Sequence, residues 1–320
     1  MDGSVEKIIR RLSGEGHEGW KNPGLLKLRA EGGLLCGEGL AADPDNGPLF
    51  ALQAVRIASE LGCGLSERLA GELKLMATPP RQSAKSRLRE EFSGAITPPG
   101  GALGLRLAIQ SGLIPHLLGE GLPDNAKSPE RSEFLELAEK LDLARPEAEY
   151  RWALILRRFD RKLMQIALEG LFFDKRTEET LLKAILYTDK IYFLNTKLEL
   201  KRFIKKCGYS DYHFMDRIAR QEKKIFGRQD LKIENRLYII EEIRARGEPM
   251  AVEDLAIGKD ELIAGGLCRN AASCERMLSA LLDIAIIDPG KNKANILLKE
   301  AERINRNPLL ILINKVNWIK

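Results

Sequence analysis

The chain of 320 residues is long enough to form two or three domains, each with its own core. Its 44% hydrophobic and 30% charged residues are typical of a folded globular protein and exclude collagen-like, coiled-coil, low-complexity and disordered classes. The 51 basic residues exceed the 46 acidic ones only slightly, so a preference for a polyanion would depend on how the basic residues are distributed.

Cysteine usage and the chain ends favour a cytoplasmic protein. The five cysteines are odd in number and scattered, which predicts neither a disulfide framework nor a zinc site and favours a reducing compartment. The first twelve residues carry charges and no apolar run of signal-peptide length. The aliphatic residues 309–313 are far fewer than the about 20 that span a bilayer, so we expect no membrane insertion.

The opening 45 residues are rich in glycine, which disfavours both a long helix and an ordered strand layer. We expect a short helix there, followed by irregular chain. A helical period begins at Leu49, because Leu49, Leu52 and Val55 share one apolar face. Pro48 suits the first turn of this helix, and Gly62 suits its end.

Helical patterns continue along the rest of the chain and are separated by Pro- and Gly-rich turns. The predicted helices cover residues 67–76, 83–96, 102–111, 132–141, 148–170 and 177–194, further helices follow from 197 to 246, and a last helical segment runs from 252 to about 304. Because strand alternation is almost absent, the sequence predicts an all-α protein, an elongated array of small helical subdomains.

Positive charge is concentrated between residues 197 and 232, which hold eleven Lys or Arg and five acidic residues. Lys and Arg recur there at helical i, i+4 spacing, so a basic stripe can form beside several aromatic residues. Such a stripe is typical of RNA-binding proteins, and the alternative is a solvated helix face over core aromatics. The predicted RNA-binding residues are Lys201, Arg202, Lys205, Lys206, Arg217, Arg220, Lys223 and Lys224.

Residues 47–62, GPLFALQAVRIASELG, resemble the neck helix of class II tRNA nucleotidyltransferases and bacterial poly(A) polymerases, whose pattern reads EDPLRLLRAVRFAxxLG. Residues 86–92, SRLREEF, and 104–114, GLRLAIQSGLI, resemble the next two segments of that family in the same order. Residues 247–267 resemble the opening of its tail. The resemblance covers residues 46–305 and implies the neck, body and tail of such enzymes.

The family's chemistry belongs to an N-terminal head, where a GGxxRD turn and a DxD pair hold metal ions. Asp43-Pro44-Asp45 spells DxD but lies in a Gly/Pro-rich stretch with no preceding strand, so it indicates a turn. Gly32-Gly33 lacks the Arg-Asp that should follow it. We therefore expect no catalytic residue, no metal and no cofactor in this chain. Mg²⁺ with CTP or ATP would enter only if another polypeptide supplied a head.

The resemblance also implies a nucleotide template on the neck helix, where family members use Glu, Asp and Arg to read the bases of CTP and ATP. The corresponding positions here are Asn46, Gly47, Phe50 and Gln53. Phe50 removes a guanidinium for which there is no apolar substitute, so base selection in the family manner is expected to be lost. Arg87 and Glu91 keep the residue types and helical spacing of a motif that acts as a structural brace in the family.

The leading prediction is an RNA-binding protein, with tRNA as the expected RNA, that lacks a self-contained catalytic head. The resemblance implies that neck and body hold the acceptor arm of the tRNA while the tail grips its elbow. One alternative is the RNA-binding subunit of a split nucleotidyltransferase, whose head-domain protein binds the neck. Another is a helical protein-interaction module without RNA.

The predicted domains are a Gly-rich segment (1–45), a neck-like domain (46–120), a body-like domain with the basic stripe (121–246) and a tail-like domain with the C-terminal segment (247–320). Residues 308–319 are too apolar to stay in water. We expect them either to complete the core of the tail or to contact a partner subunit, including a second copy of the chain.

Overall fold

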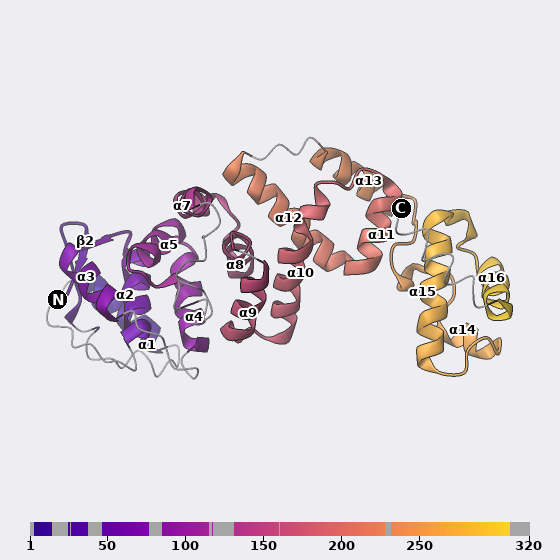
Figure 1. Cartoon of the computed structure of the whole chain (residues 1–320), viewed down its shortest axis with the longest axis horizontal. Helices are drawn as coiled ribbons and strands as arrows, with labels where there is room; N and C mark the ends of the chain where they lie inside the picture. Colours follow the sequence, from indigo (N-terminus) through magenta and orange to yellow (C-terminus); the bar gives the residue numbers. More distant parts are fainter. Residues whose placement is uncertain are drawn as a thin grey trace. The chain divides into compact units, whose positions relative to one another are not determined.

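The computed structural model describes residues 3–14, 25, 27–37, 47–76, 85–114, 117, 131–159, 161–227 and 232–307. Within these ranges the chain is predominantly helical, so the predicted all-α class is confirmed (Figure 1). The chain separates into two compact units, Met1–Thr188 with Arg217–Gln229, and Asp189–Asp216 with Asp230–Lys320. This division follows packing alone, and the four predicted domains stay a prediction.

The first unit is built mostly of helices. Its elements are α1 (Gly3–Gly14), β1 (Arg29–Glu31), β2 (Leu34–Cys36), α2 (Gly47–Leu61), β3 (Gly64–Leu65), α3 (Glu67–Met76), α4 (Lys85–Ile96), α5 (Gly101–Gln110), α7 (Arg131–Lys140), α8 (Ala148–Leu156) and α9 (Arg161–Leu171). Two helices hold residues of both units, α10 (Lys175–Ile191) and α12 (Tyr209–Phe226).

A short sheet corrects the expectation of irregular chain after α1. β1 and β2 pair antiparallel, and β2 pairs parallel with β3. The turn between β1 and β2 is Gly32-Gly33, with φ of 58° and 77°, a conformation that glycine adopts without steric cost. The glycines that disfavoured a strand layer in the sequence therefore make the tight turn that allows one.

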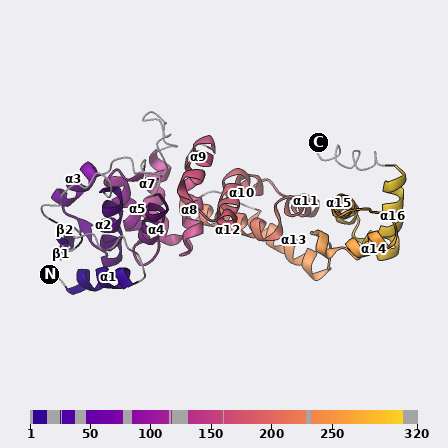
Figure 2. The same ribbon diagram turned by 90° about the horizontal axis from the view of Figure 1, so that it is seen from below.

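Helix α2 lies at the centre of the N-terminal helices of the first unit, with α1, α3, α4 and α5 around it (Figures 1 and 2). It is buried at most positions, because it packs against α4 on one side and α5 on another. Gly104 on α5 lets α5 lie close to α4, since a Cβ there would overlap the carbonyl oxygen of Ala95 on α4. The many apolar residues of α2 are therefore explained by its contacts with helices on more than one side.

The predicted helix over 148–170 is wrong in one respect, because it is two helices. α8 ends at Leu156, and turns follow at residues 157–159 before α9. The break lies where Arg157 and Arg158 both direct their guanidinium groups to Glu222 of α12. Trp152 links α8 to α4, because its indole N–H donates to Ser93 Oγ at 2.8 Å.

The second unit begins with the last turn of α10. Its further helices are α11 (Lys197–Cys207), α13 (Ile233–Ala245), α14 (Lys259–Ala264), α15 (Ala271–Ile287) and α16 (Ala294–Arg306). The predicted continuous helical segment over 252–304 is therefore three helices, with α15 preceded by an Asn270 cap that accepts from Ser273 N at 2.8 Å. Leu262, Leu281 and Leu297, one from each helix, are fully buried in a common core.

No helix in the part of the chain that the structure describes has both the length and the apolarity needed to cross a bilayer. The C-terminal segment 308–319, for which the sequence predicts packing against a core or a partner, lies outside the described residues.

Candidate nucleic-acid interface

The degenerate template positions lie at the start of α2, in the interior of the first unit. Gly47 opens the helix, and a Cβ there would come within 2.7 Å of the carbonyl oxygen of Met76. Phe50 is 4% exposed and Gln53 is fully buried. Asn46 lies outside the described residues. Phe50 thus belongs to the hydrophobic core, which gives a packing reason for an aromatic side chain at this position.

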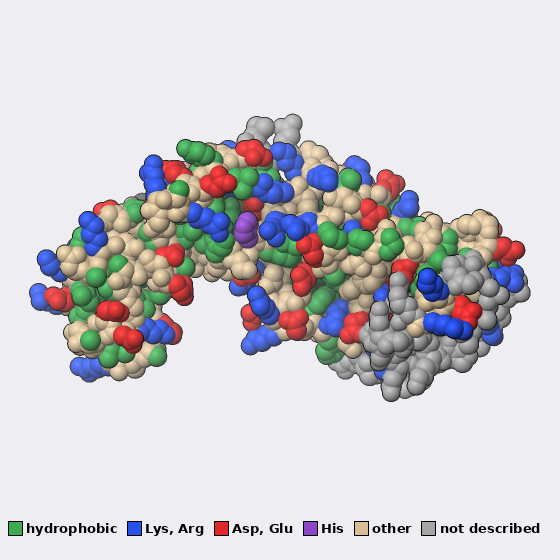
Figure 3. Space-filling view, turned by 180° about the vertical axis from the view of Figure 1, so that it is seen from behind, with side chains coloured by type: hydrophobic (Ala, Val, Ile, Leu, Met, Phe, Trp, Pro, Cys, Tyr) green, Lys and Arg blue, Asp and Glu red, His purple; other side chains and the backbone are tan. Residues whose placement is uncertain are grey.

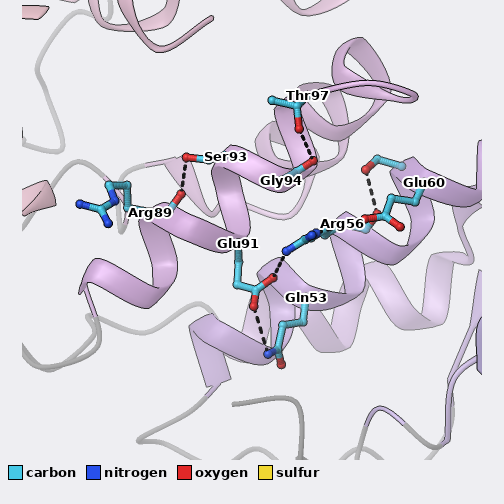
Figure 4. Close-up of polar contacts among 9 residues, drawn as sticks. Gln53, Arg56, Glu60, Arg89, Glu91, Ser93, Gly94 and Thr97 are labelled. Atoms are coloured by element: carbon cyan, nitrogen blue, oxygen red, sulfur yellow. Dashed lines mark hydrogen bonds and ion pairs between the residues drawn. The ribbon is translucent and has the colours of Figure 1, made fainter. Parts of the chain in front are cut away.

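Glu91 on α4 holds α2 and α4 together through a small polar network (Figure 4). Its Oε1 accepts from Gln53 Nε2 at 3.5 Å, and its Oε2 pairs with Arg56 Nη1 at 3.3 Å. Arg56 also pairs with Glu60 one turn further along α2, at 3.1 Å. The Glu91 side chain is only 7% exposed, so these contacts neutralise a nearly buried carboxylate.

This network links Glu91 of α4 to α2, and the brace of Arg87 and Glu91 stays a prediction from the resemblance. Arg87 lies one turn before Glu91 on α4 and its side chain is exposed. Sequence reasoning missed Arg56 as a partner of Glu91. The only signal was that Arg56 and Glu60 are charged within an otherwise apolar helix, and a charge in such a setting needs a partner.

Three lysines of the predicted basic stripe face carboxylates within the second unit. Lys197 Nζ lies 2.9 Å from Glu248 and 3.1 Å from Glu242. Lys201 is 1% exposed and lies 2.5 Å from Glu248. Lys205 pairs with Asp283 of α15 and donates to the carbonyl oxygen of Ser279 at 2.7 Å. One face of α11 is therefore neutralised internally.

The prediction that Lys201 and Lys205 contact RNA is corrected by this geometry. Both ammonium groups are already paired at short distance, and reaching a phosphate would leave Glu248 and Asp283 without these partners in a largely buried setting. Arg202 and Lys206 lie on another face of α11, where Arg202 is half-buried and Lys206 exposed. They stay predicted RNA contacts.

The other four predicted RNA-binding residues belong to the first unit, on the second half of α12. Arg217 Nη1 donates to the hydroxyl of Tyr150 at 3.1 Å, and Lys224 Nζ donates to the carbonyl oxygen of Leu143 at 3.2 Å. Arg220 is half-buried, and Lys223 is exposed. The stripe predicted from the sequence is thus divided between the two units.

The single acidic residue among these cations is removed from the surface. Glu222 is fully buried and accepts from Arg157 Nε at 3.0 Å and Nη2 at 3.1 Å, and it also pairs with Arg158. The guanidinium of Arg158 lies over the ring of Phe226, 4.6 Å from its centroid. This cluster fixes α12 against the end of α8. The exposed basic residues of this part of α12 are Lys223 and Lys224.

Arg145 extends this positive region from the segment before α8. Its backbone N–H donates to Gln221 Oε1 on α12 at 3.0 Å, and its guanidinium lies 5.3 Å from the ring centroid of Tyr150. The side chain pairs at 3.0 Å with Glu147, and this hydrogen bond lowers the pKa of the Glu147 carboxyl. We call Arg145, Arg217, Arg220, Lys223 and Lys224 the α8–α12 basic surface.

On the face drawn in Figure 3, basic side chains are interspersed with acidic and apolar ones. Positive charge therefore does not cover that face as one continuous field. Selection of a polyanion would have to rest on local groups of cations such as the α8–α12 basic surface.

Among the described residues, no three His, Cys, Asp or Glu side chains are placed to share a metal ion. Asp43 and Asp45, the DxD pair weighed in the sequence, lie outside these residues. The strands of the short sheet contain one acidic residue, Glu31, which pairs with Arg29 at 3.3 Å. A two-metal site needs several clustered carboxylates, and the described strands do not supply them.

Comparison with known proteins adds no relative: no family model, no curated protein and no solved structure matches this chain. The resemblance to class II tRNA nucleotidyltransferases accordingly stays a prediction from motifs.

Proposed function

We propose that this protein binds RNA through the α8–α12 basic surface and does not itself extend the RNA. One observation carries the proposal. Glu222 is buried beneath Arg157 and Arg158, and apart from it the charged residues of α12 from Arg217 onward are all basic, with Lys223 and Lys224 exposed, Arg217 and Arg220 half-buried, and Arg145 beside them. Basic groups held on a rigid helix at about one-turn spacing suit successive backbone phosphates. The choice of tRNA among RNAs rests on the motif resemblance.

The test is a titration of folded tRNA with the full chain at several salt concentrations. We expect the logarithm of the affinity to fall linearly with the logarithm of salt concentration, because counterions leave the RNA as lysines and arginines replace them. The variant Lys223→Ala/Lys224→Ala should bind more weakly. Its salt slope should be shallower by roughly 0.7–0.9 for each phosphate that the variant no longer neutralises.

A matched control removes the same number of charges elsewhere in the first unit. Arg68 and Lys74 on α3 are exposed, and Arg68→Ala/Lys74→Ala should leave both affinity and salt slope unchanged. Binding that ignores salt, or equal affinity for tRNA and duplex DNA, would refute the proposal. Extension of the RNA by the purified chain with Mg²⁺, CTP and ATP would refute the claim that it does not polymerise.

A further inference from the structure

A second feature of the first unit, far in sequence from the α8–α12 basic surface, has an unusual backbone. Phe172 lies in the turn between α9 and α10, with φ of 52°, and is the one non-glycine residue with positive φ in the described ranges. Its side chain is 47% exposed. The left-handed conformation is unfavourable for a residue with a Cβ and a bulky ring, so the surrounding structure must enforce it.

Arg89 on α4 supplies that enforcement. Its Nη1 donates to the carbonyl oxygens of Phe172 and of Leu171, the latter at 3.4 Å. Its guanidinium also lies 5.2 Å from the ring centroid of Phe173. Phe173 in turn packs edge-on against Trp152, with ring centroids 5.5 Å apart. The ring of Phe173 thus packs inside the first unit, and the ring of Phe172 stays 47% exposed on a backbone that Arg89 holds.

Basic side chains from two helices lie near Phe172. Lys85 on α4 lies near the last turn of α9, since its ammonium would lie 3.7 Å from a Cβ built on Gly170. Lys175 and Arg176 are exposed at the first turn of α10, where the helix dipole disfavours cations and favours anions.

The acidic residues next to the turn are engaged in the fold. The carboxylate of Asp174 caps α10 by accepting from Thr177 N at 3.0 Å, and hydrogen bonds from the side chain and then the backbone of Thr177 lower the pKa of its carboxyl. Glu90 pairs with Arg89 at 3.2 Å. Glu169, on the last turn of α9, is an exposed acidic side chain near the turn. Glu178 and Glu179 follow on the first turns of α10, the one half-buried and the other exposed, so two exposed acids, Glu169 and Glu179, also lie near Lys85, Lys175 and Arg176.

An exposed aromatic ring flanked by cations is the arrangement with which proteins bind single-stranded nucleic acid. A base stacks on the ring, and lysine or arginine contacts the adjoining phosphates. A site for an apolar protein segment would instead call for further apolar side chains around the ring, and the neighbours here are charged. This favours RNA over a protein partner.

We propose that Phe172 is a stacking platform for an unpaired base of the bound RNA, with Lys85, Lys175 and Arg176 contacting the flanking phosphates. This inference rests on the proposed RNA-binding function and deepens it, because it assigns an unpaired segment of the RNA to the α9–α10 turn.

The test uses the full chain and a single-stranded RNA oligonucleotide carrying one 2-aminopurine, whose fluorescence is quenched by stacking. Phe172→Gly should fold as well as the parent or better, because glycine accepts φ of 52° without strain. We expect it to bind the oligonucleotide more weakly by roughly 5- to 150-fold, the equivalent of one base–aromatic stack. Phe172→Trp, which keeps an aromatic ring at this position, should bind the oligonucleotide with the affinity and the quenching of the parent chain.

The matched control is Phe193→Gly in the second unit, where the phenylalanine is 74% exposed and has no positive φ. It should leave affinity unchanged. If Phe172→Gly binds like the parent while Lys223→Ala/Lys224→Ala still weakens tRNA binding, the stacking proposal is wrong and RNA binding stands; Phe172 would then be reassigned to a protein contact. If the parent chain binds no RNA, both proposals fall.

Discussion

Lys201 offers the sharpest test of the difference between a basic stripe and an internal ion pair. The substitution Lys201→Met keeps most of the volume of the buried stem and removes the ammonium that lies 2.5 Å from Glu248. If Lys201 serves the fold through this ion pair, the variant should lose stability. If the stripe is an RNA-binding face, the variant should instead lose affinity at constant stability.

The size of the expected destabilisation follows from the contacts. Removing one partner of a buried pair costs about 3–5 kcal/mol when the remaining charge has no other partner. Here Glu248 keeps Lys197 at 2.9 Å, so the cost is closer to that of one charge-assisted hydrogen bond, about 1.5–3 kcal/mol. We expect a destabilisation of about 2–3 kcal/mol. The second variant Lys201→Met/Glu248→Met should recover part of it, because no unpaired carboxylate is left behind.

The assay is urea unfolding followed by far-ultraviolet circular dichroism, with tRNA binding measured well below the unfolding transition. The control is Arg202→Met, on another face of the same helix, where the residue is half-buried. We expect that control to change stability by less than about 1 kcal/mol. A Lys201→Met variant as stable as the parent, or one that weakens tRNA binding while fully folded, would refute the interpretation.

Two further predictions concern stability. Burial acts to raise the pKa of Glu248, but the hydrogen bonds and charges of Lys201 and Lys197 outweigh it, so the pKa lies below its ordinary value. A depressed folded pKa gives stability that is present above the ordinary value near ~4.3 and is lost as pH falls below it; this acid-induced loss should be smaller in Lys201→Met, as measured by urea midpoints from pH 6 to pH 3. The substitution Gly104→Ala should destabilise the first unit by about 1–3 kcal/mol or more, because its Cβ would overlap a backbone oxygen. The substitution Gly71→Ala, where a Cβ meets nothing within 4 Å, should stabilise the first unit by about 0.5–1 kcal/mol. If the midpoint temperatures of thermal unfolding of the two variants shifted in the same direction, this account would be contradicted.

Much of the helical layout could be predicted from local pattern. The 67–76 helix has the predicted bounds, and α2, α5 and α7 differ from the prediction by one or two residues. Period, caps and turn residues are properties of neighbouring positions, so they need no tertiary information. The errors occur where distant residues intervene, as at Arg157 and Arg158, whose pairing with Glu222 coincides with the end of a helix that the local pattern would continue.

The candidate site depends even more on contacts between residues far apart in the sequence. The spacing of Lys201 and Lys205 establishes that they share one face of a helix, and nothing in the spacing says what that face meets. Their partners Glu248 and Asp283 lie on segments 47 and 78 residues further along the chain. Burial of Phe50 and the outward position of Phe172 are equally non-local, since the first depends on the helices around α2 and the second on Arg89 of α4.

Local sequence pattern was enough to predict that the chain is helical, the bounds of several helices to within two residues, and the concentration of Lys and Arg between residues 197 and 232. Which of those charges face carboxylates inside the fold depends on tertiary packing, as the pairing of Lys201 with Glu248 and of Lys205 with Asp283 shows. The physical reason is that hydrogen-bonded helical geometry is set by adjacent residues, whereas the environment of a charge is set by whatever the chain brings next to it.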